Sequence, residues 1–122
     1  MAEILIINDS PSINAMFCMR LEASRFSVDA VETAEEGVEK AKAGQYQLII
    51  LDYNLPGMSG AQASQILKKD AKTQNIPILL MSAADDEKVS EILKTVQVDG
   101  VISAMADGNE LIEKVKSFIK NG

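Results

Sequence analysis

The chain has 122 residues, of which 47% are hydrophobic and 25% are charged, and its formal net charge is -6 at pH 7. A chain of this length fits one domain, so we expect residues 1–122 to form a single domain. The acidic excess opposes binding to phosphate backbones, and no apolar run approaches the roughly 20 residues that cross a bilayer. We therefore expect a cytoplasmic protein that binds neither nucleic acid nor membrane directly.

The chain contains no histidine and a single cysteine, Cys18. This composition excludes zinc sites built from His and Cys, Ser-His-Asp and Cys-His nucleophile systems, and a histidine phosphate relay within the chain. Any phosphoryl group must therefore come from another molecule. Cys18 lies among apolar residues of a predicted helix, where we expect a buried thiol that acts as a small hydrophobic side chain.

The first predicted element is a strand at residues 4–7, which are all apolar. Ser10 and Pro11 then predict the start of a helix with apolar positions over residues 13–21, because the missing amide hydrogen of a proline has no partner in a first turn. Residues 28–31 alternate between apolar and polar side chains, which is typical of an edge strand.

Three pairs of residues have the spacing of a capping box, in which polar side chains satisfy the free amides of a helix's first turn. These pairs are Thr33 with Glu36, Ser59 with Gln62, and Asp107 with Glu110. A helical pattern over residues 89–96 brings the number of predicted helices to five.

Further apolar runs predict strands at residues 48–51, 76–81 and 98–102. The runs at 4–7 and 48–51 are apolar on both faces, so these two strands should be central. Regular alternation of strands and helices predicts an α/β fold with a doubly wound parallel sheet, whose ligands bind beyond the carboxyl ends of the strands.

Two aspartates directly follow predicted strands, Asp9 after the first and Asp52 after the third. If these strands are neighbours, both carboxylates should converge on the ligand crevice. Clustered carboxylates raise a pKa or recruit a cation, and an open site with oxygen ligands suits Mg²⁺. The sequence therefore predicts a Mg²⁺ site at Asp9 and Asp52.

A structural alternative is that Asp9 caps the first helix and Asp52 begins a turn, since both roles are common for aspartate. A dinucleotide site is disfavoured, because the turn after the first strand reads Asn8-Asp9-Ser10-Pro11 and lacks the glycines that cradle a phosphate. The chain has no P-loop sequence either.

Three segments carry a family resemblance: ILIINDS at residues 4–10, LIILDYNLPGMSG at residues 48–60 and IPILLMSA at residues 76–83. With them, the chain resembles the receiver domains of bacterial two-component response regulators over essentially its whole length. The resemblance implies a flavodoxin-like α/β fold, with five parallel strands in the order 2-1-3-4-5 flanked by five helices.

The resemblance also implies a role for each residue of the site. Asp52 would be the phosphoacceptor and would take its phosphoryl group from a histidine kinase or a phosphotransfer protein. Asp9, Asp52 and the backbone carbonyl of Asn54 would ligate Mg²⁺, and Ser82 would hydrogen-bond the phosphoryl group. Such a module regulates other proteins and is not an enzyme beyond gaining and losing its own phosphoryl group.

The chain departs from the family pattern at four positions. Ala104 stands where the family has a lysine, Val101 where it has an aromatic switch residue, and Asn8 where it has the first member of an acidic pair. Met105 replaces a proline that follows a cis bond, so we expect a trans bond between Ala104 and Met105. Phosphorylation should be weakened, because a hydrogen bond involving a charged group is worth roughly 1.5 to 3 kcal/mol.

Two functional hypotheses remain. In the first, weak Mg²⁺-dependent phosphorylation of Asp52 changes the affinity for a partner protein. In the second, the chain is a pseudo-receiver, an interaction module that phosphorylation no longer controls. A hydrolase of the related phosphatase type ranks third, because it would need an acidic residue where Asn54 stands.

Overall fold

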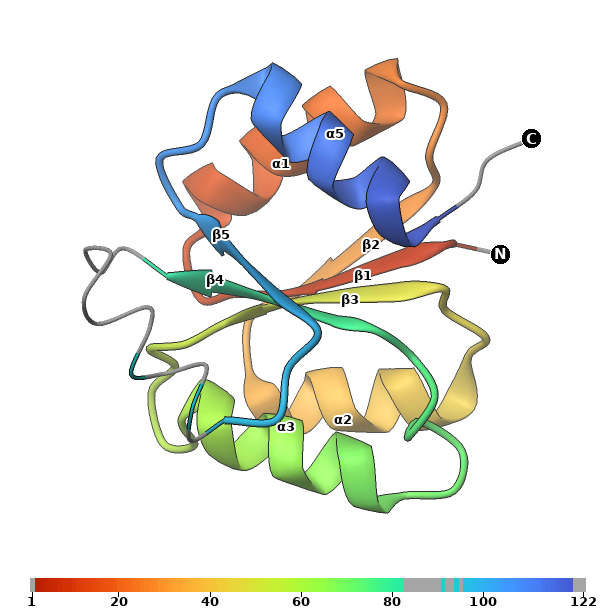
Figure 1. Ribbon diagram of the computed structural model, residues 1–122, viewed down its shortest axis with the longest axis vertical. Coiled ribbons are helices and arrows are strands. Elements are labelled where there is room, and N and C mark those ends of the chain that lie inside the picture. The colour runs from red at the N-terminus through yellow and green to blue at the C-terminus, as the bar shows by residue number, and fades with distance from the viewer. Residues whose placement is uncertain (1, 83–90, 92–93, 95, 120–122) are drawn as a thin grey trace.

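The computed structural model describes residues 2–82, 91, 94 and 96–119. A five-stranded parallel sheet lies at its centre (Figure 1). The strands are β1 (Ile4–Ile7), β2 (Val28–Val31), β3 (Leu48–Asp52), β4 (Ile78–Ser82) and β5 (Gly100–Ser103). Their order across the sheet is β2-β1-β3-β4-β5, which confirms the predicted fold class and strand order. As expected, β2 lies at an edge and β1 and β3 lie inside.

Helices cover both faces of the sheet. Figure 1 shows α1 (Pro11–Ala23) and α5 (Gly108–Phe118) on one face, and α2 (Ala34–Ala43) and α3 (Gly60–Lys69) on the other. The further helix predicted over residues 89–96 falls almost wholly outside the described residues. Among the described helices, none has the length and apolar character needed to cross a membrane.

The inner strands fill two hydrophobic cores, one on each face of the sheet. Ile49 and Leu80 belong to the core under α2 and α3, whereas Ile50 and Met81 belong to the core under α1 and α5. Successive residues of a strand point to opposite faces, so a strand buried on both faces has to be apolar throughout. This is why β1, β3 and β4 are almost continuous apolar runs in the sequence.

Each described helix begins at a residue whose side chain accepts a hydrogen bond from a first-turn amide. The capping residues are Ser10, Thr33, Ser59 and Asp107. Ser59 and Gln62 form a complete capping box with both reciprocal bonds, and Pro11 occupies the first turn of α1. The helix starts predicted by the capping pattern are therefore confirmed.

Some strand boundaries differ from the predicted ones. The strands β4 and β5 both begin two residues later and end one residue later than expected. Their predicted first residues belong to local turns instead, because the amide of Ile76 donates to Thr73 and that of Val98 donates to Val96. Apolar character alone does not distinguish a buried turn residue from the first residue of a strand.

Cys18 packs against the core under α1 and α5 as a small hydrophobic side chain would, but it is only partly buried and not buried as expected. Burial raises the pKa of its thiol above the ordinary value, and the negative charges of Glu22 and Asp29 raise it further. The thiol therefore stays protonated at neutral pH, the form in which cysteine is least reactive.

Candidate functional site

Asp52 is the last residue of β3 and its side chain is half-buried. Burial raises the pKa of its carboxyl group above the ordinary value. The backbone N–H groups of Asn54 and Tyr53 oppose this shift by hydrogen bonding, while the negative charge of Asp9 adds to it. The Asn54 N–H donates to Asp52 Oδ1 over 3.3 Å, so Asp52 also begins a turn.

Asp9 follows β1, the strand beside β3, and so lies at the same edge of the sheet as Asp52. Since Ile7 of β1 is level with Leu51 of β3, Asp9 comes one residue beyond the level of Asp52. Its side chain is exposed, and the helix cap is Ser10, which accepts a hydrogen bond from the amide of Ile13. Asp9 is therefore not the cap of α1, and its charge acts on Asp52.

A tight loop follows Asp52 and returns to its backbone. The turn contains Pro56 and Gly57, and Gly57 has a φ of 82°, a conformation that side chains other than glycine rarely adopt. The loop closes where the amide of Gly60 donates to the carbonyl of Tyr53 over 2.8 Å. This closure places the start of α3 directly beside the site.

Asn8, at the position of the lost acidic residue, is 2% exposed and points to a buried partner that the sequence did not reveal. Its side-chain amide donates to Asn14 Oδ1 over 3.2 Å, and the Asn14 amide donates to the backbone carbonyl of Asn8 over 2.8 Å. Asn14 is itself only 7% exposed. We call this pair the Asn8–Asn14 clasp.

A sequence signal for Asn14 exists in hindsight. Asn14, Phe17 and Leu21 are the buried residues of α1 and have helical spacing, so Asn14 occupies a core-facing position. A buried amide needs hydrogen-bonding partners, and this requirement predicts a polar neighbour. It does not predict which one.

Ser82 ends β4, beside β3, and is 2% exposed. It comes one residue after Met81, which is level with Asp52. Its carbonyl accepts a hydrogen bond of 3.0 Å from the amide of Ala104, so Ala104 follows β5 at the same sheet edge. The sheet thus brings positions 9, 52, 82 and 104 to its carboxyl edge, and the methyl group of Ala104 offers no charge there.

The loop after β5 has trans peptide bonds throughout its described residues, which confirms the prediction for Ala104 and Met105. The Met105 side chain is 87% exposed. The carbonyl of Ala106 accepts a hydrogen bond of 3.3 Å from Arg20 Nη1 of α1. Arg20 thus contacts a loop residue that lies 86 positions further along the chain, and no local sequence pattern predicts this contact.

The oxygen atoms at the carboxyl edge fit Mg²⁺ better than a transition metal. Within the described part of the chain, no three His, Cys, Asp or Glu side chains gather to form a metal cluster. Mg²⁺ usually keeps several water ligands and binds through one or two carboxylates, so Asp9 and Asp52 are the candidate carboxylate ligands at this edge. The backbone carbonyl of Asn54 is a further candidate oxygen.

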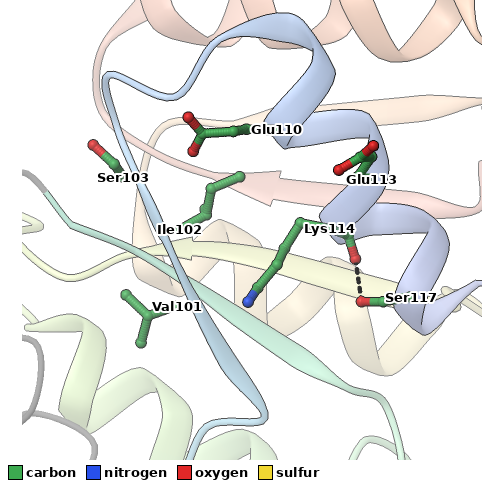
Figure 2. Close-up of a pocket in the computed structure, with 7 residues that line it drawn as sticks. All are labelled: Val101, Ile102, Ser103, Glu110, Glu113, Lys114 and Ser117. Carbon is green, nitrogen blue, oxygen red and sulfur yellow. Dashed lines mark hydrogen bonds between the residues drawn. The ribbon is translucent and has the colours of Figure 1, made fainter.

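A separate groove of about 410 Å³ lies along the outer side of β5 against α5 (Figure 2). Figure 2 shows Val101 and Ser103 on the strand side and Glu110 and Lys114 on the helix side. The Lys114 side chain extends across the groove toward β5. The side chain of Val101, the position without the aromatic residue, points away from α5 and lies partly buried against the core under α2 and α3.

A model of the response regulator receiver domain family matches residues 4–116. The chain belongs to this family, and it is a regulatory receiver domain of two-component signalling. Receiver domains accept phosphoryl groups from histidine kinases or phosphotransfer proteins, and Mg²⁺ binding is typical of the family.

Individual relatives are similar over most of this chain. The phosphate regulon regulator PhoB of Klebsiella pneumoniae is 29% identical over 117 residues, which cover 96% of this chain and 51% of PhoB. The chain thus spans about half the length of PhoB. Protein PilH of Pseudomonas aeruginosa is 34% identical over 87 residues, which cover 71% of this chain and 72% of PilH.

Solved structures agree with the fold. Chemotaxis response regulator CheY4 of Vibrio cholerae superposes with a TM-score of 0.89 at 23% identity, covering 98% of this chain and 99% of CheY4. Response regulator TrrA of Thermotoga maritima, solved in complex with Mg²⁺-BeF, superposes with a TM-score of 0.84 at 28% identity, covering 98% of this chain and all of TrrA.

Proposed function

We propose that the chain is a receiver switched by Mg²⁺-dependent phosphorylation of Asp52. The observation that carries this proposal is the meeting of two carboxylates at one sheet edge, where burial raises the pKa of Asp52 and the negative charge of Asp9 adds to the rise. The repulsion between two neighbouring carboxylates costs free energy unless a cation neutralises their charge. The related TrrA, whose structure holds Mg²⁺-BeF, supports the choice of ion.

Asp9, Asp52 and the backbone carbonyl of Asn54 would hold the ion. When bound, Mg²⁺ would neutralise charge on the carboxylates and on the phosphoryl oxygens. Asp52 Oδ would attack the phosphorus in line, the bond between phosphorus and the donor would break, and Asp52 would become an aspartyl phosphate. The Ser82 hydroxyl would hydrogen-bond one of the phosphoryl oxygens.

The missing lysine sets the strength of this chemistry. Ala104 contributes no positive charge to the phosphoryl group, and one charged hydrogen bond is worth roughly 1.5 to 3 kcal/mol. That energy corresponds to about one to two decades in a rate or an equilibrium. We therefore expect phosphorylation that is slower or less extensive than lysine would give, followed by loss of the phosphoryl group to water.

The donor in this proposal is a histidine kinase or a phosphotransfer protein in the cytoplasm, and the output is a changed affinity for a partner protein. The net charge of -6 supports a protein rather than a nucleic-acid partner for this segment. Domains present in longer relatives such as PhoB carry no information about this chain's own partner.

The test is intact mass spectrometry after incubation with Mg²⁺ and a small acyl phosphate. Wild type should gain one phosphoryl group, and Asp52→Asn should gain none. Asp107→Asn is the matched control, because asparagine caps a helix as well as aspartate does and Asp107 caps α5. A gain of mass that persists in Asp52→Asn would contradict the proposal.

A second candidate function is the phosphorylation-independent interaction module. The observations that favour it are the uncharged Ala104 and the open groove beside Val101 (Figure 2). In this case a partner would bind wild type and Asp52→Ala with equal affinity, with or without Mg²⁺. A strong dependence on Asp52 would decide against it.

A further inference from the structure

We infer that Asn14 is a positioning residue that fixes Asp9 at the metal edge through its side-chain bonds to Asn8, the residue that precedes Asp9. This inference rests on the proposed Mg²⁺ site. It concerns a residue of α1 that follows Asp9 by five positions and that has no charge of its own.

The contacts of Asn14 run to both sides of Asp9. On one side its side chain forms the clasp with Asn8, accepting from the Asn8 amide and donating to the Asn8 carbonyl. On the other side its backbone N–H makes the ordinary helical bond to the carbonyl of Ser10 over 3.0 Å, which does not depend on the side chain. The amide of Asn8 is held as well, by the carbonyl of Val31 in β2 over 3.0 Å.

Burial makes the clasp rigid. Asn8 and Asn14 are 2% and 7% exposed, so water cannot easily replace a lost partner. Within the described residues, no buried side-chain nitrogen or oxygen lacks a hydrogen bond. Removing the Asn14 amide would leave the Asn8 carbonyl and side chain without their buried partners, and the turn would have to shift to reach others.

Asp9 itself has no such restraint, since its exposed side chain is not the cap of α1. Its position therefore depends on its neighbours in the chain. Residues that orient metal ligands without touching the metal typically change metal affinity by about 10- to 100-fold when they are replaced. We expect the lower end of that range, because water completes much of a Mg²⁺ shell.

The test compares two variants, each of which loses a buried side-chain hydrogen bond. Asn14→Ser shortens the side chain and removes the clasp. Thr73→Val is the matched control, because the Thr73 hydroxyl is fully buried and donates to the Leu67 carbonyl over 2.6 Å. Thr73 precedes β4, so it lies at the amino edge of the sheet, far from Asp52.

We expect the Mg²⁺ dissociation constant to rise about tenfold in Asn14→Ser and to stay within twofold of wild type in Thr73→Val. A residue that only stabilises the fold would leave the affinity unchanged in both variants. Equal dissociation constants for wild type and folded Asn14→Ser would overturn the inference.

A second measurement requires no metal. Hydrogen exchange of the amides of residues 8–10 should become faster in Asn14→Ser and stay unchanged in Thr73→Val. Unchanged exchange in both variants would overturn the inference. If wild type binds no Mg²⁺ at all, the proposed function fails, and this exchange comparison alone decides whether Asn14 fixes the turn.

Discussion

Gly60 lies directly against the backbone of Asp52. A Cβ atom at Gly60 would fall 2.5 Å from the Asp52 carbonyl oxygen and 2.7 Å from the Tyr53 Cα, both of them backbone atoms that cannot rotate away. The first residue of α3 thus sets how closely the helix approaches the end of β3. This contact gives the site a packing requirement that does not involve charge.

Replacing Gly60 with alanine should therefore disturb the site. We expect Gly60→Ala to lower the free energy of unfolding by about 1 to 3 kcal/mol, as overpacking does, and to weaken Mg²⁺ binding because the Asp52 backbone has to move. Denaturant unfolding and Mg²⁺ titration measure the two effects. The control is Gly108→Ala at the first residue of α5, where the new Cβ atom would come no closer than 3.6 Å to the side chain of Arg20 in α1. This substitution should leave stability unchanged or raise it by up to about 1 kcal/mol.

The raised pKa of Asp52 predicts a pH-dependent stability difference. Because burial and Asp9 raise the folded-state pKa above the ordinary value of 3.8, the folded protein holds this proton more tightly than the unfolded chain does. As the pH rises through 3.8, the unfolded chain ionises first and stability is lost until the folded-state pKa has been passed. Below that window the carboxyl group is neutral in both states.

Without metal, Asp52→Asn should therefore be more stable than wild type at pH 7 and equally stable once the pH falls below 3.8. Thermal unfolding of both proteins across this range measures the difference. Adding Mg²⁺ should reduce it by stabilising wild type alone. A difference that does not vary with pH would mean that the charge of Asp52 is not its cause.

Restoring a cation at position 104 should strengthen phosphorylation. Ala104 follows β5 at the sheet's carboxyl edge, where its amide bonds Ser82. We expect Ala104→Lys to raise the extent or rate of phosphorylation by about 10-fold, at the low end of one charged hydrogen bond. Mass spectrometry after exposure to an acyl phosphate measures this change.

The matched control for that prediction is Ala104→Met, which adds a side chain of similar length without a charge. It should behave like wild type. An equal gain in Ala104→Lys and Ala104→Met would show that packing rather than charge limits the reaction.

Position 101 should accept a large side chain, because the Val101 side chain is only partly buried. It points away from α5 and lies at the margin of the core under α2 and α3 (Figure 2). We expect Val101→Tyr to change the free energy of unfolding by less than about 1 kcal/mol. Ile102→Tyr should cost about 1 to 3 kcal/mol, because Ile102 is 5% exposed and belongs to the core under α1 and α5. Similar losses in both variants would mean that the partly buried position 101 does not accommodate the ring.

Local and periodic features of the sequence predicted most of the fold. Ser59 and Gln62 are three residues apart, so their capping box depends on one helical turn and can be recognised without tertiary structure. The strand order came from the family resemblance, and the five parallel strands confirm it. Strand ends were less predictable, because Ile76 and Val98 are apolar although they lie in turns.

The site was only partly predictable for a physical reason. The sheet edge collects residues that follow strands, so Asp9 and Asp52 could be paired from their positions alone. The partners of Asn14 and Arg20 could not be predicted in this way, because they depend on how α1 packs against the rest of the fold. Arg20 contacts Ala106 across 86 residues, and no local pattern encodes that distance.

A Mg²⁺ titration of the metal-free protein, followed by thermal or denaturant unfolding, tests the central claim most directly. If Asp9 and Asp52 share one ion, wild type should gain stability in a saturable way, by about 2.7 kcal/mol when the Mg²⁺ concentration is 100 times the dissociation constant. Asp9→Asn and Asp52→Asn should each lose most of this gain. Equal responses of wild type and both variants, or no response of wild type, would contradict the account.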